Sequence, residues 1–120
     1  MYRDAKRAVA DRAFEVDAEY AAIVRLAEHF VAAGAEVVLV NTPESPLMLA
    51  DYEDSPYYDA YRGFFSDLAE RLPSTRFVDL SEALEVDDFN DLHHPTFVGA
   101  IELGPVYADL VAEALRRAEP

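Results

Sequence analysis

Residues 34–43 read GAEVVLVNTP, and this stretch decides the fold. Four consecutive aliphatic residues, Val37 to Val40, lie between Gly34 and Pro43. A short apolar run without polar alternation predicts a β-strand that is buried on both faces. A helix, a glycine turn and a strand of this kind, in that order, predict an α/β layer fold.

Apolar residues recur at three- and four-residue steps on both sides of this strand, which predicts two amphipathic helices. The first precedes the strand and ends near Gly34, at the position of a C-cap glycine, while residues 3–14 are expected to extend it toward the N-terminus. The second runs from Tyr57 to Leu72 and ends before Pro73. The apolar face of the first helix consists of Val16, Tyr20, Ile23, Val24, Ala27, Phe30 and Val31.

The rest of the chain predicts a second strand, at residues 76–80, and a final helix over residues 95–117. Residues 41–56 contain three prolines and are expected to form a long loop, and residues 81–84 are expected to form a capped helical turn. Pro105 has no N–H for the carbonyl of the residue four positions earlier, so the final helix should kink or restart after Gly104.

Two parallel strands joined by a right-handed crossover helix are the natural arrangement of these elements. The strand at residues 37–40 has a central character, yet the chain supplies only one partner strand. Its other edge should therefore be bare. We expect a homo-oligomer or a hetero-complex to form through that edge, or the chain to be a piece of a larger domain.

Composition narrows the classes of function. The 120 residues suggest one domain, 1–120, and the net charge of −14 argues against binding nucleic acid or an anionic membrane surface. Solubility is the simple explanation of the charge, and a cationic partner is the alternative. There is no cysteine, and no apolar run approaches the ~20 residues of a membrane span or resembles a signal peptide. The chain as given is therefore expected to be cytoplasmic.

Asp91 and His94 carry the clearest chemistry. In a tight turn, their spacing allows the carboxylate to accept a hydrogen bond from one imidazole nitrogen and leaves the other nitrogen basic. The carboxylate then fixes the tautomer and stabilises the imidazolium, as in an acyl-transfer triad. The alternative is that His94 caps the helix that begins near Pro95.

Residues 89–94, Phe-Asn-Asp-Leu-His-His, followed by Gly99 and Ala100, resemble the closing block of the SGNH (GDSL-like) hydrolase superfamily. Residues 78–81 and 38–43 are similar to strand ends in members related to alginate O-acetyltransferases and to proteins of teichoic-acid D-alanyl transfer. The resemblance covers residues 14–115 and corresponds to the C-terminal half of a complete domain. It implies a three-layer, flavodoxin-like parallel sheet, here incomplete, with about two strands and three main helices. It also implies that Asp91 and His94 are the acid and base of a Ser-His-Asp triad.

The chain departs from this pattern at the nucleophile. None of its four glycines precedes Asp-Ser, and the oxyanion-hole glycine and asparagine of the family are also unmatched, because Asn41 stands at a strand end without that context. Ser45 and Ser55 are the other serines to consider, but loop serines beside prolines are usually turn residues. The serine is therefore expected upstream or on another chain, and the isolated chain is predicted to be inactive.

Histidines, acidic residues and tyrosines of the chain suggest further kinds of site. His93, His94 and Asp91 are candidate metal ligands, but adjacent histidines usually diverge, and His29 is the one other histidine of the sequence. A three-ligand site needs side chains that converge, so we expect neither metal nor cofactor. Residues 87–88 lack the pattern of a calcium loop. Four tyrosines are either core residues or the lining of an acyl or sugar pocket: Tyr52, Tyr57, Tyr58 and Tyr61.

Three functions remain open from the sequence. The chain is part of an SGNH-type serine esterase or O-acyltransferase, acting on an acyl ester or acyl acceptor once the site is completed. Alternatively, it is a catalytically inert SGNH-like remnant that serves as an interaction or oligomerisation domain. The third reading is a small hydrolase with an unorthodox nucleophile such as Ser45.

Overall fold

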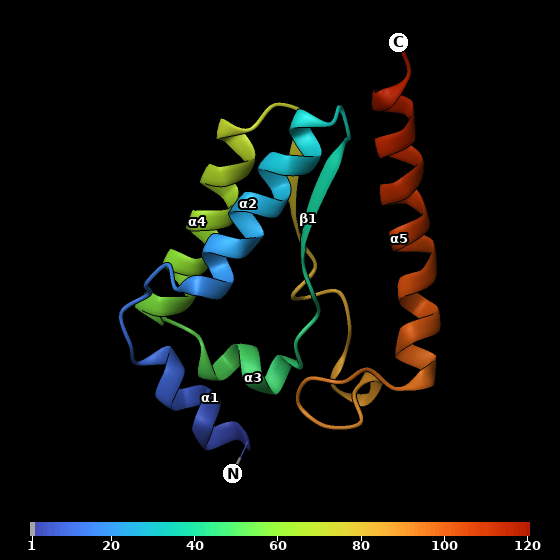
Figure 1. Cartoon of the computed structure of the whole chain (residues 1–120). Coiled ribbons are helices and arrows are strands. Elements are labelled where there is room, and N and C mark those ends of the chain that lie inside the picture. The colour runs from blue at the N-terminus through green and yellow to red at the C-terminus, as the bar shows by residue number, and fades with distance from the viewer. Residues whose placement is uncertain (1) are drawn as a thin grey trace.

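A computed structural model of the protein describes residues 2–120, without the side chains at positions 2, 3, 5 and 6. The elements in chain order are α1 (Tyr2–Ala10), α2 (Ala18–Ala32), β1 (Val37–Asn41), α3 (Pro46–Asp51), α4 (Pro56–Arg71), β2 (Thr75–Asp79), the 3₁₀-helix η1 (Val86–Asp88) and α5 (Phe97–Ala118). Helices α2 and α4 lie on one face of the sheet and α5 on the other, so the chain has three layers (Figure 1). The expected α/β class is confirmed.

β1 and β2 form the sheet, and they run parallel, as expected. Val37 pairs with Thr75 at one end and Asn41 with Asp79 at the other. Helix α4 connects the strands and packs on β2, while α2 packs on β1. Each of these helices therefore covers the strand that follows it in the chain.

The predicted extension of the first helix toward its N-terminus is wrong. Helix α1 ends at Ala10, and residues 11–17 cross to α2 without helical structure. The Asp17 carboxylate accepts hydrogen bonds from the N–H groups of Glu19 and Tyr20, both at 3.0 Å. An N-cap of this kind starts a new helix, which explains the break. At the other end of α2, Gly34 adopts a φ of 84°, as a glycine after a helix should.

Three further expectations need correction. The loop at residues 41–56 contains α3, because Ser45 caps it and Pro46 occupies its first turn. Residues 81–84 form turns instead of a helix, and the N–H of Ser81 bonds to the carboxylate of Asp79. Helix α5 continues through Pro105 without a restart, since proline removes only the one hydrogen bond that it cannot donate.

The core is thin. Buried apolar residues form two small clusters, one around Met48 and Tyr52 and one around Phe89 and Leu103. The four aliphatic residues of β1 are only half-buried, against the expectation of burial on both faces. The physical reason is that β1 has a neighbour on one side only.

No helix within residues 2–120 combines the length and the apolar character needed to cross a membrane.

Candidate functional site

A closed loop between η1 and α5 carries Asp91 and His94. Phe89 and Pro95 form an antiparallel bridge at its base, and the N–H of Asn90 donates to the carbonyl of His94 at 2.8 Å. Phe89 is buried, which anchors the loop to α5. The loop is therefore held at both ends.

Thr96, and not His94, caps α5. The Thr96 hydroxyl accepts a hydrogen bond from the N–H of Gly99 at 3.1 Å. The alternative that His94 is present to cap the helix is therefore wrong, and the His94 side chain is left for another role.

The Asp91 carboxylate binds His94 directly. Asp91 Oδ2 lies 2.8 Å from His94 Nδ1, and Asp91 Oδ1 accepts hydrogen bonds from the backbone N–H groups of His93 and His94 at 2.7 and 2.6 Å. Because Nδ1 faces the carboxylate, Nε2 lies on the opposite side of the ring. The His94 side chain is 73% exposed, so this second nitrogen is accessible from outside.

The same contacts lower the pKa of Asp91 far below its usual range. The hydrogen bond from the His94 ring is the main cause, followed by the backbone N–H groups of His94 and His93. Donors that bind the ionised form favour it. Asp91 is therefore a permanent negative charge at neutral pH, as a residue that orients a histidine must be.

We expect a carbon-detected NMR titration to show the Asp91 carboxyl carbon still ionised at pH values where other aspartates are protonated. The lowered pKa means that the loop hydrogen bonds are present above the ordinary aspartate range. They are lost only as the pH falls through the lower value of the folded state. In His94→Gln the Asp91 pKa should rise toward the ordinary range. An Asp91 that titrates with the other exposed carboxylates in the unaltered chain would contradict the arrangement.

The loop lies beside the carboxyl end of β1. The N–H of Ser45 donates to the carbonyl of Leu92 at 3.2 Å. The Glu44 carboxylate lies 3.2 Å from His93 Nδ1, and Glu44 is buried. Two segments that are far apart in sequence thus meet where the strands end, which is the usual place for a site in a parallel α/β sheet.

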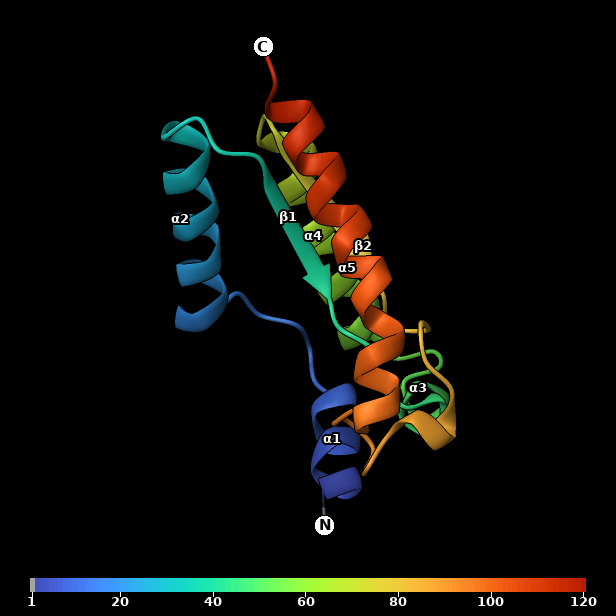
Figure 2. The same cartoon turned by 90° about the vertical axis from the view of Figure 1, so that its right-hand side faces the viewer.

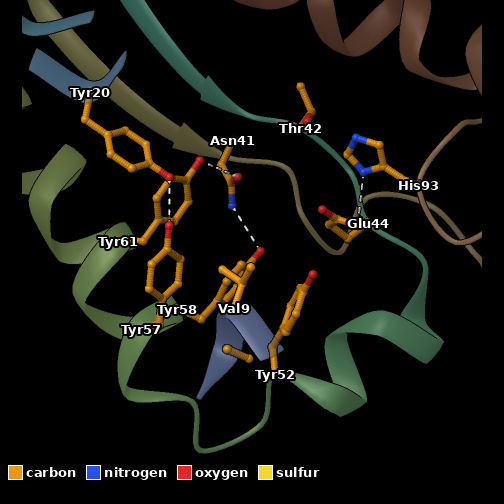
Figure 3. Close-up of a pocket in the computed structure, with 11 residues that line it drawn as sticks. Val9, Tyr20, Asn41, Thr42, Glu44, Tyr52, Tyr57, Tyr58, Tyr61 and His93 are labelled. Carbon is orange, nitrogen blue, oxygen red and sulfur yellow. Dashed lines mark hydrogen bonds and ion pairs between the residues drawn. The ribbon is translucent and has the colours of Figure 1, made fainter. Parts of the chain in front are cut away.

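A cavity of about 520 Å³ opens at the same end of the sheet. We call it the tyrosine pocket, because five of its eleven lining residues are tyrosines (Figure 3). Its lining residues are Val9, Ala10, Tyr20, Asn41, Thr42, Glu44, Tyr52, Tyr57, Tyr58, Tyr61 and His93. All four tyrosines of the predicted cluster line this cavity, and Tyr52 also belongs to the buried core.

Asn41 organises this pocket. Its side chain accepts a hydrogen bond from the Tyr61 hydroxyl at 3.2 Å and donates to Asp79 Oδ1 at 3.0 Å and to the Tyr58 hydroxyl at 3.5 Å. On the other wall, the hydroxyls of Tyr20 and Tyr57 lie 3.0 Å apart. The pocket thus offers ring edges and hydroxyl groups at fixed positions.

Burial raises the pKa of Tyr61 to about 12 and also raises that of Tyr58. In an absorbance titration at 295 nm, we expect these tyrosines to ionise after the exposed ones. A raised pKa means that the neutral pocket stabilises the fold below a pH of about 10. This stability is lost as the pH rises toward 12. One uniform transition for all seven tyrosines, in a chain that is still folded, would contradict the buried pocket.

The alternative serines serve as helix caps. Ser45 is 1% exposed, and its Oγ accepts a hydrogen bond from the N–H of Leu47. Ser55 Oγ accepts from Tyr58 N–H and donates to the carbonyl of Ala10 at 2.8 Å. Buried hydroxyls in these roles are poor nucleophiles, so the structure gives no support to a hydrolase built on Ser45.

Among the described residues, no three histidine, aspartate or glutamate side chains converge as metal ligands. His29 is exposed on α2, and Asp88 accepts the backbone N–H of Glu85 at the start of η1.

Glu44 and Asn41 are site residues that the sequence patterns did not single out. A useful signal was present, because Asn41 directly follows the buried strand, where parallel α/β proteins place their site residues.

The fold and the site define an α/β-layered protein with an exposed Asp–His pair beside a tyrosine-lined pocket at the carboxyl end of its parallel strands. A family model matches residues 1–116, and the chain belongs to that family. An uncharacterised protein of Leptospira interrogans serogroup Icterohaemorrhagiae serovar Lai (strain 56601) is 37% identical over 71 residues. The match spans 59% of this chain but only 13% of that relative. No solved structure matches the chain.

Proposed function

We propose that the chain is part of an SGNH-type serine esterase or O-acyltransferase, in which His94 is the general base and Asp91 orients it. The single observation that carries this is the 2.8 Å contact between Asp91 and the inner nitrogen of an exposed histidine ring. The resemblance of residues 89–100 to the closing block of that superfamily supports the same conclusion.

In this scheme His94 Nε2 takes the proton of a serine hydroxyl as the serine oxygen attacks an ester carbonyl. Asp91 stabilises the imidazolium that forms, and His94 returns the proton to the departing alcohol oxygen. Water or an acceptor hydroxyl then attacks the acyl-enzyme by the reverse sequence of proton transfers. None of these steps requires a metal or a cofactor.

The nucleophile itself lies outside this chain. No Gly-Asp-Ser sequence is present, so the serine comes from an upstream segment or another chain. The triad contributes about 10⁶-fold as a unit, and little of this remains without its serine. The isolated chain is expected to hydrolyse p-nitrophenyl acetate no faster than buffer.

The tyrosine pocket is where we place the acyl or acceptor part of the substrate. Glu44 and His93 line the pocket, and His93 belongs to the loop of residues 89–95, which we call the catalytic loop. The rings of His93 and His94 lie 5.2 Å apart. Hydroxyl groups and ring edges suit a ligand that combines apolar and hydroxylated parts.

The test begins with the coding sequence upstream of this chain. We expect a strand followed by Gly-Asp-Ser, and we call the product of joining it to residues 1–120 the completed assembly. A fluorophosphonate probe should label the serine of the completed assembly and leave the isolated chain unlabelled. If no such segment is encoded nearby, or if the completed assembly is not labelled, the proposed function fails.

The second candidate, a catalytically inert interaction domain, is favoured by the missing nucleophile and by the half-buried strand β1. It predicts a stable oligomer or hetero-complex in size-exclusion chromatography with light scattering. Two results would count against it: an isolated chain that is a monomer, or esterase activity in the completed assembly.

A further inference from the structure

The outer edge of β1 is open. The N–H of Val37 donates to Ser74, and the carbonyl of Asn41 accepts from Leu80, so these two residues face β2. Backbone groups of alternate residues point to the same side of a strand. The N–H and C=O groups of Val38 and Val40 therefore point outward, where the described chain has no strand to receive them.

Apolar surface continues from this edge onto the helices on both sides. Helix α2 lies beyond the outer edge of β1, on the face opposite α5 (Figure 2). Its outer stripe, Ile23, Leu26 and Phe30, is exposed although it is apolar. On the other face, a groove of about 430 Å³ runs between β1 and α5 and is lined mainly by Val38, Val40, Leu110, Val111, Ala114 and Leu115.

The chain exposes more surface than a compact monomer of its mass, and the excess is as large as a protein–protein interface. A monomer of this mass should expose about 6,500 Å², whereas this chain exposes 7679 Å². The radius of gyration is 15.7 Å, compared with about 14 Å for a compact domain of this length. The excess of roughly 1,200 Å² exceeds the ~800 Å² that each partner buries in a typical stable complex.

The arrangement of α2 indicates which element is missing. Helix α4 leads into β2 and packs on it, and α2 leads into β1 and packs on it in the same way. Crossover units are almost always right-handed, so helices on one face of a parallel sheet follow the same order across the sheet as the strands that they precede. The position of α2 thus leaves room for a strand that is parallel to β1, on the side away from β2.

We propose that this edge receives a β-strand of a further α/β segment of a longer polypeptide, parallel to β1, apolar on both faces and neutral or basic in charge. The Leptospira relative supports that source, because the matched residues are only 13% of its length. A second copy fits less well. Each copy carries a charge of −14, and a two-fold axis through paired β1 edges would bring both α2 helices over the same edge.

A parallel strand in this place would bring its carboxyl end toward the catalytic loop. A serine at the carboxyl end of that strand could reach His94. This consequence rests on the proposed function. The open edge itself does not depend on the chemistry of Asp91 and His94.

The direct test uses a fluorescent peptide, KKVIVIVGKK, as the strand, with KKVIPIVGKK as its broken control. We expect the first peptide to bind the chain at least ten-fold more tightly in fluorescence anisotropy. Val38→Pro removes only an outward N–H, so its circular dichroism should be unchanged while peptide binding falls at least ten-fold. Leu26→Glu, on the exposed stripe of α2, should also weaken peptide binding without altering β1. This variant replaces Val38→Pro as the test if Val38→Pro does not fold.

The direction of the bound strand and the identity of the natural occupant are checked with the same peptides and variants. A nitroxide on the N-terminus of the peptide should broaden the amide signal of Val37, and one on its C-terminus that of Asn41. Broadening in the reverse order would overturn the parallel arrangement, and equal binding of both peptides would overturn the docking edge. A dimer of the chain that Val38→Pro dissociates would show that a second copy is the occupant. None of these readouts depends on esterase activity, so failure here is distinct from failure of the proposed function.

Discussion

In the completed assembly, His94→Ala should lower kcat/KM for p-nitrophenyl acetate by about 10⁵-fold or more, because the serine loses its only base. Asp91→Asn should lower it by about 10⁴-fold, since the amide cannot stabilise the imidazolium and favours the wrong tautomer. The double variant should be little worse than His94→Ala alone, because the two residues act as one unit. Steady-state kinetics with single-turnover controls measure all three.

His93→Gln is the matched control for this prediction. His93 is the chain neighbour of His94, but its Nδ1 faces the Glu44 carboxylate instead of Asp91. Its loss should change KM more than kcat if the tyrosine pocket holds the substrate. Equal losses of kcat in His93→Gln and His94→Ala would show that the loop is needed only for folding.

The spacing of Asp91 and His94 was enough to predict their contact, because a carboxylate three residues before a histidine reaches its ring within one turn of loop. The strands and the crossover helix also followed from periodicity and from Gly34 and Pro73. These are local signals, and local hydrogen bonds and caps satisfy them in the structure.

The tyrosine pocket was harder to predict, because its wall comes from five separate segments of the chain. Tyr20 lies on α2, Asn41 ends β1, and Tyr61 lies on α4, so no sequence spacing relates them. Burial of β1 was overestimated for a similar reason. The composition of a strand shows what it is suited to pack against, but not whether that neighbour belongs to the same segment.

Gly99→Ala should destabilise the fold, while Gly104→Ala in the same helix should stabilise it slightly. A Cβ at Gly99 would lie 2.6 Å from the backbone oxygen of Asp88, whereas a Cβ at Gly104 meets nothing within 4 Å. Forcing backbone apart costs about 1–3 kcal/mol of unfolding free energy. Replacing a free helical glycine by alanine gains about 0.5–1 kcal/mol. Urea unfolding of both variants measures the difference.

Gly99→Ala should also affect the loop that carries Asp91 and His94. The oxygen that a Gly99 Cβ would displace also accepts the N–H of Thr96 at 2.6 Å, and together these contacts fix the distance between η1 and the first turn of α5. The loop of Asp91 and His94 spans that distance, so Gly99→Ala should also raise the Asp91 pKa toward its ordinary range. Equal stability changes in Gly99→Ala and Gly104→Ala would contradict this close approach.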